Sequence, residues 1–205
     1  MLMLMCFGLS VSGAEGATFA VDPGRTSLVV QVFRDGVAAR FGHDHVVRAT
    51  AFSGRVNYDP AAPGGSSIRV DVDTTRLEVD DRATRRKFGL SGEPSAADVA
   101  DIERSMKAAS QLDVSTFPRM TFVLTRMTAE APDRYVVSGQ LTMRGVSNAV
   151  RFPASVWMEG HIFRASATLE FLQSSFGYAP YRALLGAIRN RDDVKLHVDL
   201  TATPE

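Results

Sequence analysis

The segment Ile68-Arg69-Val70-Asp71-Val72-Asp73 decides the fold class, because apolar and charged residues alternate along its whole length. Successive side chains of a β-strand point to opposite faces, so its aliphatic residues share one face and its charged residues the other. Near the other end of the chain, Val194-Lys195-Leu196-His197-Val198-Asp199-Leu200 repeats the pattern. We therefore expect strands with one buried and one solvated face, which is typical of antiparallel sheets.

Similar alternation recurs between these two segments and before the first of them. It predicts strands at residues 28–33, 46–58, 120–127, 135–143, 150–158 and 163–172. Residues that favour turns separate the strands: Asp59-Pro60, Pro63-Gly64-Gly65, Ala131-Pro132-Asp133, Arg144-Gly145 and Glu159-Gly160. Many strands joined by short turns predict an all-β fold, either a sandwich or an antiparallel sheet closed into a barrel. Closure has the advantage that it removes exposed strand edges.

Three segments break the strand pattern. Ser95 followed by Asp98 is typical of a helix amino terminus, and apolar residues then recur at helical spacing, which predicts a helix over residues 96–109. Shorter helical turns are expected over residues 81–88 and 181–189. We expect one or two of these short helices to cap an end of the barrel.

The composition of the 205 residues restricts the class of protein. Hydrophobic residues make up 45% of the chain, enough for one substantial core, and no repeat or linker marks off a second domain. The 23 Lys and Arg residues balance the 23 Asp and Glu residues, so no overall charge recruits nucleic acid or an anionic membrane. We expect residues 18–205 to form a single domain.

Residues 1–17 have the features of a secretory signal peptide. The apolar run over residues 1–11 is too short to span a bilayer, which takes about 20 residues, and small residues follow it. No basic residue precedes Arg25, which favours a leader whose printed start is truncated; the alternative is a hydrophobic first strand. Cleavage would remove Cys6, the single cysteine, so we expect a periplasmic or secreted mature protein without disulfides.

Several longer motifs occur in a fixed order. The most specific is Ser138-Gly139-Gln140-Leu141-Thr142-Met143-Arg144-Gly145-Val146-Ser147. The others are Phe19-Ala20-Val21-Asp22-Pro23, Phe52-Ser53-Gly54-Arg55-Val56 with Tyr58-Asp59-Pro60, Leu112-Asp113-Val114-Ser115-Thr116-Phe117-Pro118 with Met120-Thr121-Phe122, and Phe176-Gly177 with Asp192-Asp193-Val194. Together they resemble the YceI-like family of secreted polyisoprenoid-binding proteins over residues 18–203. Thr26 departs from the family pattern, which has a histidine at this position.

The resemblance implies a lipocalin-like antiparallel β-barrel whose elongated interior holds an apolar isoprenoid-type lipid or a quinone. It implies a binding protein and not an enzyme, one that carries or sequesters its ligand and requires no cofactor. The expected partner is an apolar small molecule; a dimer and transient contact with a membrane stay open. Such a tunnel needs inward aromatic and aliphatic side chains. The candidate ligand-binding residues are Phe33, Phe41, His43, His45, Phe52, Phe122, Leu141, Met143, Trp157, Phe171, Phe176, Tyr178, Tyr181, Leu184 and Leu185.

Each apolar candidate has a second interpretation, since an inward aromatic side chain in a barrel more often belongs to the packed core. The segment that favours a ligand site is Phe176-x-Tyr178-x-x-Tyr181 beside Leu184-Leu185, because it is rich in aromatic residues and lies outside the regular strands.

His43 and His45 leave three alternatives open. On one face of a strand, both rings could reach one metal ion, which supports a metal-binding protein or a metal-dependent enzyme as the alternative function. No glutamate follows in Val46-Val47-Arg48-Ala49-Thr50, so a third ligand would have to come from elsewhere. The pair could instead contact the polar headgroup of a ligand, or form a structural hydrogen-bonded pair near a barrel end.

A basic run occurs within residues 82–87. A solvated helical face beside Asp80-Asp81 is the favoured interpretation, and contact with a pyrophosphate or a membrane surface is the alternative. The run consists of Arg82, Arg85, Arg86 and Lys87. No segment resembles a nucleophile elbow, a phosphate loop or a dinucleotide fingerprint, so the sequence makes no positive case for an enzyme.

Overall fold

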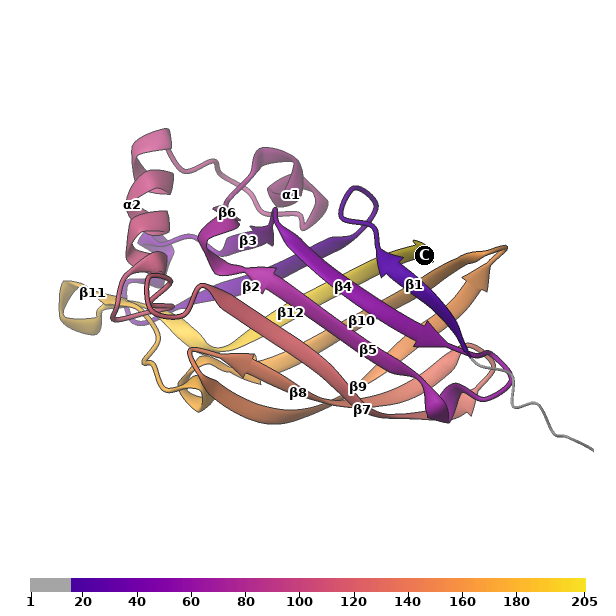
Figure 1. The fold of residues 1–205 in the computed structure, drawn as a ribbon. Helices are drawn as coiled ribbons and strands as arrows, with labels where there is room; N and C mark the ends of the chain where they lie inside the picture. The colour runs from indigo at the N-terminus through magenta and orange to yellow at the C-terminus, as the bar shows by residue number, and fades with distance from the viewer. Residues whose placement is uncertain (1–15) are drawn as a thin grey trace, which may run out of the picture.

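The fold is built mainly from antiparallel β-strands, as Figure 1 shows for the computed structural model, which describes residues 16–205. The predicted signal peptide lies outside the described residues, apart from its last two positions. The strands are β1 (Ala17–Val21), β2 (Ser27–Asp35), β3 (His45–Ala49), β4 (Phe52–Tyr58), β5 (Ser67–Asp73), β6 (Leu77–Val79), β7 (Arg119–Ala131), β8 (Arg134–Met143), β9 (Val146–Glu159), β10 (Ile162–Leu172), β11 (Arg182–Ala183) and β12 (Ile188–Pro204). The helices are α1 (Arg82–Lys87) and α2 (Ala96–Lys107), with short 3₁₀ turns η1 (Ala39–Phe41), η2 (Pro63–Gly65), η3 (Thr74–Arg76), η4 (Gln173–Phe176) and η5 (Leu184–Gly186).

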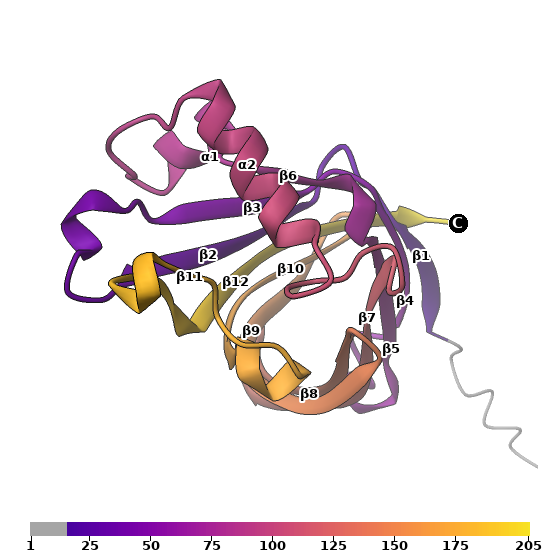
Figure 2. The same ribbon diagram turned by 90° about the vertical axis from the view of Figure 1, so that its left-hand side faces the viewer.

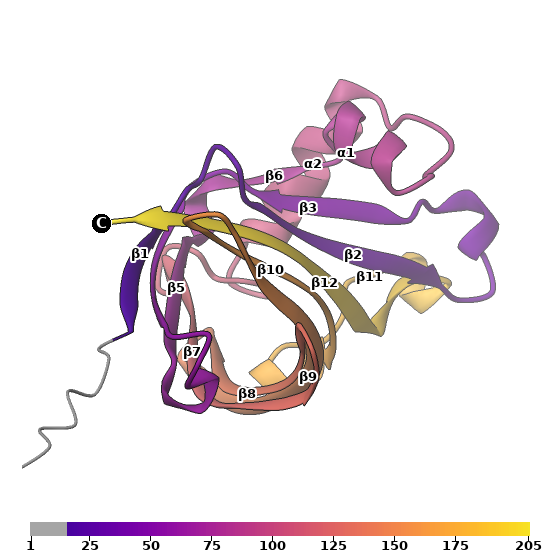
Figure 3. The same cartoon turned by 90° about the vertical axis from the view of Figure 1, so that its right-hand side faces the viewer.

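Eight of the strands close into a ring in the order β1-β4-β5-β7-β8-β9-β10-β12, and β1 then pairs with the end of β12. This last pairing joins Phe19 to Pro204 and Val21 to Ala202. The first and last strands of the chain therefore complete the barrel (Figure 3). A closed ring leaves no unpaired edge along these strands.

Three further strands extend the sheet at one end of the barrel. β2 pairs with β12 over the part of β12 that precedes its pairing with β1, β3 pairs with β2, and β6 pairs with β3. Helix α2 lies across this end, and β11 lies beside the start of β12 (Figure 2). We call this end the mouth; it is bounded by α2, by β11 and by the loop of residues 36–44 between β2 and β3.

Strand β5 shows how alternation leads to this barrel. Val70 is buried and pairs with Phe122 of β7 and Gly54 of β4, whereas the neighbouring Arg69 and Asp71 form an ion pair at 2.7 Å on the opposite face. The same division into an apolar inner face and a polar outer face is repeated around the ring. The predicted antiparallel barrel with short helices capping one end is confirmed.

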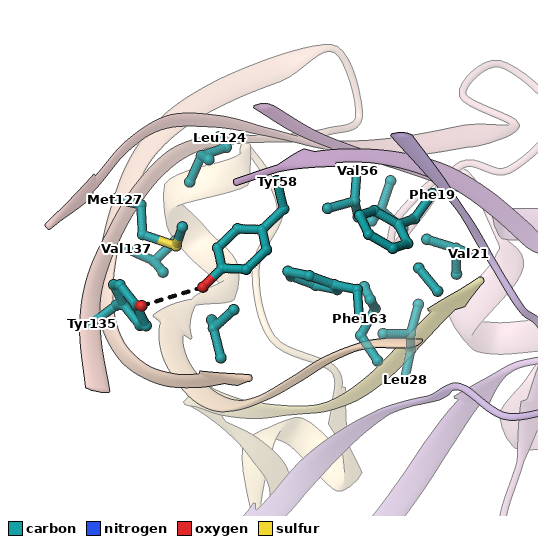
Figure 4. Close-up of a cluster of buried hydrophobic side chains, with 14 residues drawn as sticks. Phe19, Val21, Leu28, Val56, Tyr58, Leu124, Met127, Tyr135, Val137 and Phe163 are labelled. Atoms are coloured by element: carbon teal, nitrogen blue, oxygen red, sulfur yellow. Dashed lines mark hydrogen bonds between the residues drawn. The ribbon is translucent and has the colours of Figure 1, made fainter. Parts of the chain in front are cut away.

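An aromatic cluster fills the barrel at the end opposite the mouth (Figure 4). The ring of Phe163, which is fully buried, lies 5.1 Å from that of Tyr58 and 6.0 Å from that of Phe19. The hydroxyl groups of Tyr58 and Tyr135 lie 3.3 Å apart and share a hydrogen bond, so these buried polar atoms partner each other. Side chains therefore close this end of the barrel.

Two glycines, one in the turn between β8 and β9 and one within β8, have distinct structural roles. Arg144 and Gly145 both have positive φ, 50° and 73°, which is the two-residue turn whose twist matches antiparallel strands. Gly139 faces the interior, and a Cβ atom there would lie 2.4 Å from the ring of Phe122. The missing side chain thus makes room for Phe122 against the barrel wall.

Residues 46–58 form two strands, so the prediction of a single strand is wrong. β3 ends at Ala49 and β4 begins at Phe52. β3 pairs with β2 and β6 in the extension, whereas β4 pairs with β1 and β5 in the ring. The chain must change neighbours between them, and there the amide of Thr50 donates to the carbonyl of Arg76 at 3.0 Å.

The helical turn predicted over residues 181–189 is wrong for most of its length. It contains the extended β11, which pairs with Ile188 and Arg189 of β12, and only the short turn η5 is helical. The other two helices are confirmed as α1 and α2, and Ser95 caps α2 together with Asp98. Within residues 16–205, no helix has the length and apolarity needed to cross a bilayer.

The cluster at the closed end should carry a large share of the stability of the barrel. We expect Phe163→Ala to lower the free energy of unfolding by about 3 to 5 kcal/mol, because it leaves a cavity among rings that cannot collapse together. Denaturant unfolding would measure this. Leu172→Ala on β10, where the side chain is 49% exposed, is the control and should cost less than about 1 kcal/mol. An equal loss in both variants would contradict the assignment of Phe163 to a closed core.

Candidate ligand-binding site

An apolar cavity of about 410 Å³ occupies the barrel interior and reaches the mouth. Its wall is formed by inward side chains of β2, β3, β5, β6, β7, β8, β9, β10 and β12, and by helix α2. This volume lies within the range of about 300 to 1,000 Å³ that is usual for small-molecule sites.

Aliphatic and aromatic side chains make up most of the cavity wall. They follow from the alternation of the strands, since every second residue of a strand faces inward. Characteristic members are Val30 and Val32 of β2, Ile68 and Val72 of β5, Phe122 of β7, Leu141 and Met143 of β8, Phe152 of β9, Leu169 and Phe171 of β10, and Leu196 and Val198 of β12. Helix α2 adds Ile102 and Met106 at the mouth.

Polar side chains along the cavity come from segments near the mouth. They include Arg34, His43, His45, Asp101, Gln111, Gln173, Arg189 and Asn190. The cavity is therefore apolar along the barrel and polar at its open end. This distribution of apolar and polar side chains matches an elongated amphiphile, which has an apolar chain and a polar headgroup.

A buried ionic network lies beside the mouth and is centred on Asp80. The Asp80 carboxylate, whose side chain is fully buried, accepts a hydrogen bond from Arg85 at 2.7 Å and from the backbone amide of Val46 at 3.1 Å. The second carboxylate oxygen lies 2.7 Å from Nδ1 of His45. Arg85 is only 3% exposed, so it does not belong to a solvated helical face, and that expectation for the basic run is wrong at this residue.

The remaining guanidinium contacts of Arg85 tie together three backbone segments. Arg85 donates to the carbonyls of Asp44 at 3.0 Å, Gly92 at 2.8 Å and Ser91 at 3.3 Å. The network thus joins three segments of the chain: Asp44 before β3, Asp80 after β6, and the loop of Ser91 and Gly92 that leads to α2. It fixes His45 at the cavity wall.

The charge of Asp80 is set by its partners. Burial alone would raise the pKa of this carboxyl group, but the hydrogen bonds from His45, Val46 and Arg85 outweigh burial and hold its pKa below the usual range. Asp80 is therefore ionised at neutral pH. It compensates the buried charge of Arg85 and orients the ring of His45.

The two histidines are not placed as a pair on one strand, so that premise of the metal-site alternative is wrong. β3 begins at His45, which points to Asp80, whereas His43 lies in the preceding loop and is exposed. Both rings nevertheless line the cavity at the mouth. Within residues 16–205, no three His, Cys, Asp or Glu side chains gather in a way that could hold a metal ion.

The structure brings eight of the predicted site residues to the cavity. They are His43, His45, Phe122, Leu141, Met143, Phe171, Tyr178 and Tyr181. Tyr178 lies at the mouth under the guanidinium of Arg144, 5.5 Å from the ring centre, and burial raises the pKa of its phenol group well above the usual range. Whether any of these residues binds a ligand stays a prediction.

Six other candidates lie away from the cavity. Phe33 and Trp157 face outward, each beneath an arginine, at 5.6 Å from Arg191 and 5.8 Å from Arg164 respectively. The others are Phe52 and Phe176, which pack within the core, and Leu184 and Leu185, which are exposed. The side chain of Phe41 lies outside the described part of the structure.

Sequence reasoning missed the aliphatic majority of the wall because it gave weight to aromatic residues. Strand parity was the available signal: Val30 and Val32 face inward, so Phe33 on the same strand must face outward. No local signal pointed to the contact between Asp80 and His45, which are 35 residues apart in the chain.

A closed antiparallel barrel with an apolar interior and a polar mouth defines the class of lipocalin-like barrels. The chain belongs to the YceI-like family, because residues 19–202 match the YceI-like domain. It is 27% identical over 178 residues to a UPF0312 protein of Shewanella baltica, covering 82% of this chain and 81% of that protein. A UPF0312 protein of Pseudomonas putida is 29% identical over 109 residues, 53% of this chain and 47% of that protein.

Two solved structures share the fold. The crystal structure of BcnA from Burkholderia cenocepacia superposes with a TM-score of 0.70 at 19% identity and covers 89% of this chain and 99% of BcnA. The YceI protein of Campylobacter jejuni gives a TM-score of 0.60 at 14% identity and covers 78% of this chain and 84% of that protein.

Removal of the Asp80 charge should destabilise the protein. We expect Asp80→Asn to lower the free energy of unfolding by about 3 to 5 kcal/mol at neutral pH, because it leaves Arg85 buried without a counter-charge. Because folding lowers the pKa of Asp80, its contribution is present above the ordinary carboxyl pKa of 3.8 and is lost as pH falls through the folded-state value. The difference between variant and wild type, measured by denaturant unfolding, should therefore shrink in acid.

Glu170→Gln is the control for this substitution. Glu170 pairs with Lys195 at 2.8 Å on the barrel surface, where its side chain is 60% exposed, so the loss should stay below about 1 kcal/mol. Equal stability of Asp80→Asn and Glu170→Gln would show that the buried network does not support the fold.

Proposed function

We propose that the mature protein is exported and holds one isoprenoid-type lipid or quinone in the barrel, which it carries or sequesters. Membership of the YceI-like family and the barrel fold support this function. The export step rests on the signal-peptide features of residues 1–17 and places the protein in the periplasm or outside the cell.

The observation that carries the proposal is the polarity of the cavity. Its wall is apolar along the barrel, the aromatic cluster around Phe163 closes the far end, and polar side chains gather at the mouth. A prenyl chain would enter with its tail toward Phe163 and leave its headgroup near His45. A charged or strongly hydrated ligand would lose its hydration in the barrel without gaining partners there.

The free energy of moving a lipid from a membrane into the barrel favours a carrier over a catalyst. Each buried CH₂ group gains about 0.8 kcal/mol relative to water, so a chain of roughly forty carbons would nominally gain ~30 kcal/mol. Non-covalent affinities saturate at about 18 to 21 kcal/mol. The relevant source of such a lipid is a membrane, where the chain is already in an apolar medium. Transfer into the barrel is then close to balanced, which suits reversible loading and release.

His45 is the residue best placed to meet the headgroup. Its Nδ1 is held by Asp80, and among the described residues no group forms a hydrogen bond with Nε2 of the same ring. The ring lines the cavity, and 15% of its side chain remains exposed. A hydroxyl or carbonyl group on the ligand could therefore share a hydrogen bond with Nε2.

Mass spectrometry of an organic-solvent extract tests the function. We expect one prenyl lipid or quinone per molecule of wild-type protein purified from the exported fraction. Ala167→Trp should remove most of this ligand, because Ala167 lines the cavity and a large ring would fill it. Ala149→Trp is the matched control, since Ala149 is exposed on β9, and it should retain the ligand.

Two results would contradict the function. In the first, the extract of folded, exported wild-type protein contains no ligand, and the same protein takes up no added prenol. In the second, the Ala167→Trp and Ala149→Trp variants contain equal amounts of ligand.

The headgroup contact has its own test. His45→Leu should weaken binding of a long-chain prenol by about three- to tenfold, the usual size of one hydrogen bond, and leave binding of the corresponding hydrocarbon unchanged. Fluorescence titration with a displaceable apolar probe would measure both affinities. A parallel loss for the alcohol and the hydrocarbon would instead indicate a packing role for His45.

A further inference from the structure

We propose that two loops at the mouth form a docking surface for an anionic lipid bilayer. The first loop comprises residues 36–41 after β2, and the second comprises residues 181–187 around β11 and η5. Together they are called the lip. The inference rests on the proposed function in one respect: a lipid ligand must be exchanged with a membrane.

Exposed apolar side chains concentrate on the lip. Among the side chains that the structure describes, six large hydrophobic ones are exposed, and four of these belong to the two loops. Val37 is 96% exposed, Leu184 is 71% exposed and Leu185 is completely exposed, with Tyr181 at 42%. Such side chains are costly in water and are typical of surfaces that contact a partner or a membrane.

The backbone holds two of these side chains outward at a cost. Leu184 and Leu185 have φ values of 48° and 55°, a left-handed conformation that residues with a Cβ atom adopt reluctantly. Two consecutive leucines keep this strained conformation only where the surrounding structure holds the backbone in it. Such strained sites are often functional. Here the strain presents both side chains to solvent.

The two loops are fastened into one unit. The amide of Ala38 donates to the carbonyl of Ala187 at 2.9 Å, and Arg189 binds Asp35 at 2.8 Å. Gly36 has a φ of 100°, and a Cβ atom there would lie 2.5 Å from the Ala187 carbonyl oxygen, so this close approach requires glycine. Figures 2 and 3 show the loops side by side at the mouth.

The lip continues directly into the cavity. Arg34, Tyr181, Ile188 and Arg189, at the base of the two loops, line the cavity. A bilayer in contact with the lip would therefore lie at the entrance through which a lipid passes.

The charge of the lip favours an anionic bilayer. The chain carries no net charge, but the two loops of the lip, residues 36–41 and 181–187, contain two arginines, Arg40 and Arg182, and no acidic residue. Arg182 is exposed beside the apolar side chains. Basic residues that flank exposed apolar residues are the usual composition of an interfacial membrane anchor.

A second copy of the chain fits this surface less well. A stable dimer interface buries about 1,200 to 2,000 Å² of complementary surface, whereas the lip offers the tips of two loops. A two-fold interface would also bring the arginines of both copies together. The observations therefore favour a bilayer as the occupant.

Co-flotation with vesicles tests the inference. Wild-type protein should bind vesicles of phosphatidylcholine and phosphatidylglycerol in equal parts, and bind vesicles of phosphatidylcholine alone more weakly. The double variant Leu184→Asn, Leu185→Asn should lower the partition coefficient by roughly tenfold or more. Asparagine tolerates the left-handed backbone, so the loop should keep its shape. Arg182→Gln should weaken binding only to the anionic vesicles.

Leu172→Ser is the matched control, because Leu172 is exposed at the end of β10 and lies outside the lip. It should leave the partition coefficient within about twofold of wild type. Prenol binding in vesicle-free solution separates the two proposals, since neither Leu184 nor Leu185 lines the cavity. If wild-type protein does not bind prenol in this assay, the proposed function is contradicted. Vesicle binding, in contrast, tests the lip alone.

Three results would overturn the docking surface. Wild-type protein could fail to bind anionic vesicles, or the double variant could bind them as wild type does. Alternatively, wild type could be a dimer that the double variant dissociates while neither binds vesicles, and the lip would then be an interface between copies of the chain.

Discussion

Strand β12 imposes the constraint on which the rest of the structure depends. Its last residues pair with β1 and close the barrel, whereas its earlier residues pair with β2 and carry the extension of the sheet. A register shift interrupts the pairing with β2 between Asn190 and Val194, where Gln173 donates to the carbonyl of Arg191 at 2.8 Å. Because one strand changes its neighbours along its length, the barrel is sealed at one end and widened at the other.

The two ends differ in chemistry for the same reason. Where the ring is complete, Phe163 and Tyr58 pack into the interior and leave no room for a ligand. Where β2, β3 and β6 extend beyond the ring, backbone groups of Asp44, Val46 and Gly92 are bound by side chains. The buried pair of Asp80 and Arg85 satisfies part of that backbone and fixes His45 at the wall. The polarity of the cavity thus follows from the way the sheet ends.

Loading and release of a lipid require the apolar interior to meet an apolar source without exposure of the chain to water. The mouth has two features suited to this step. Helix α2 covers the entrance with Ile102 and Met106, and the lip presents Leu184 and Leu185 outside it. Local charge decides the surface that the lip favours, since positive and negative residues cancel over the whole chain but not on the lip.

The sequence by itself determined most strands of the ring, the turns between them and the inner face of β5, because period-two alternation and turn residues are local properties. Ile68, Val70 and Val72 were assigned to one face from the sequence, and all three line the cavity. Arg144-Gly145 was likewise identified as a turn. Only the tertiary structure decided that residues 46–58 change neighbours, that Arg85 is buried against Asp80, and that Leu184 and Leu185 face solvent. These outcomes depend on pairing between segments far apart in the chain, and no local pattern records which strands become neighbours.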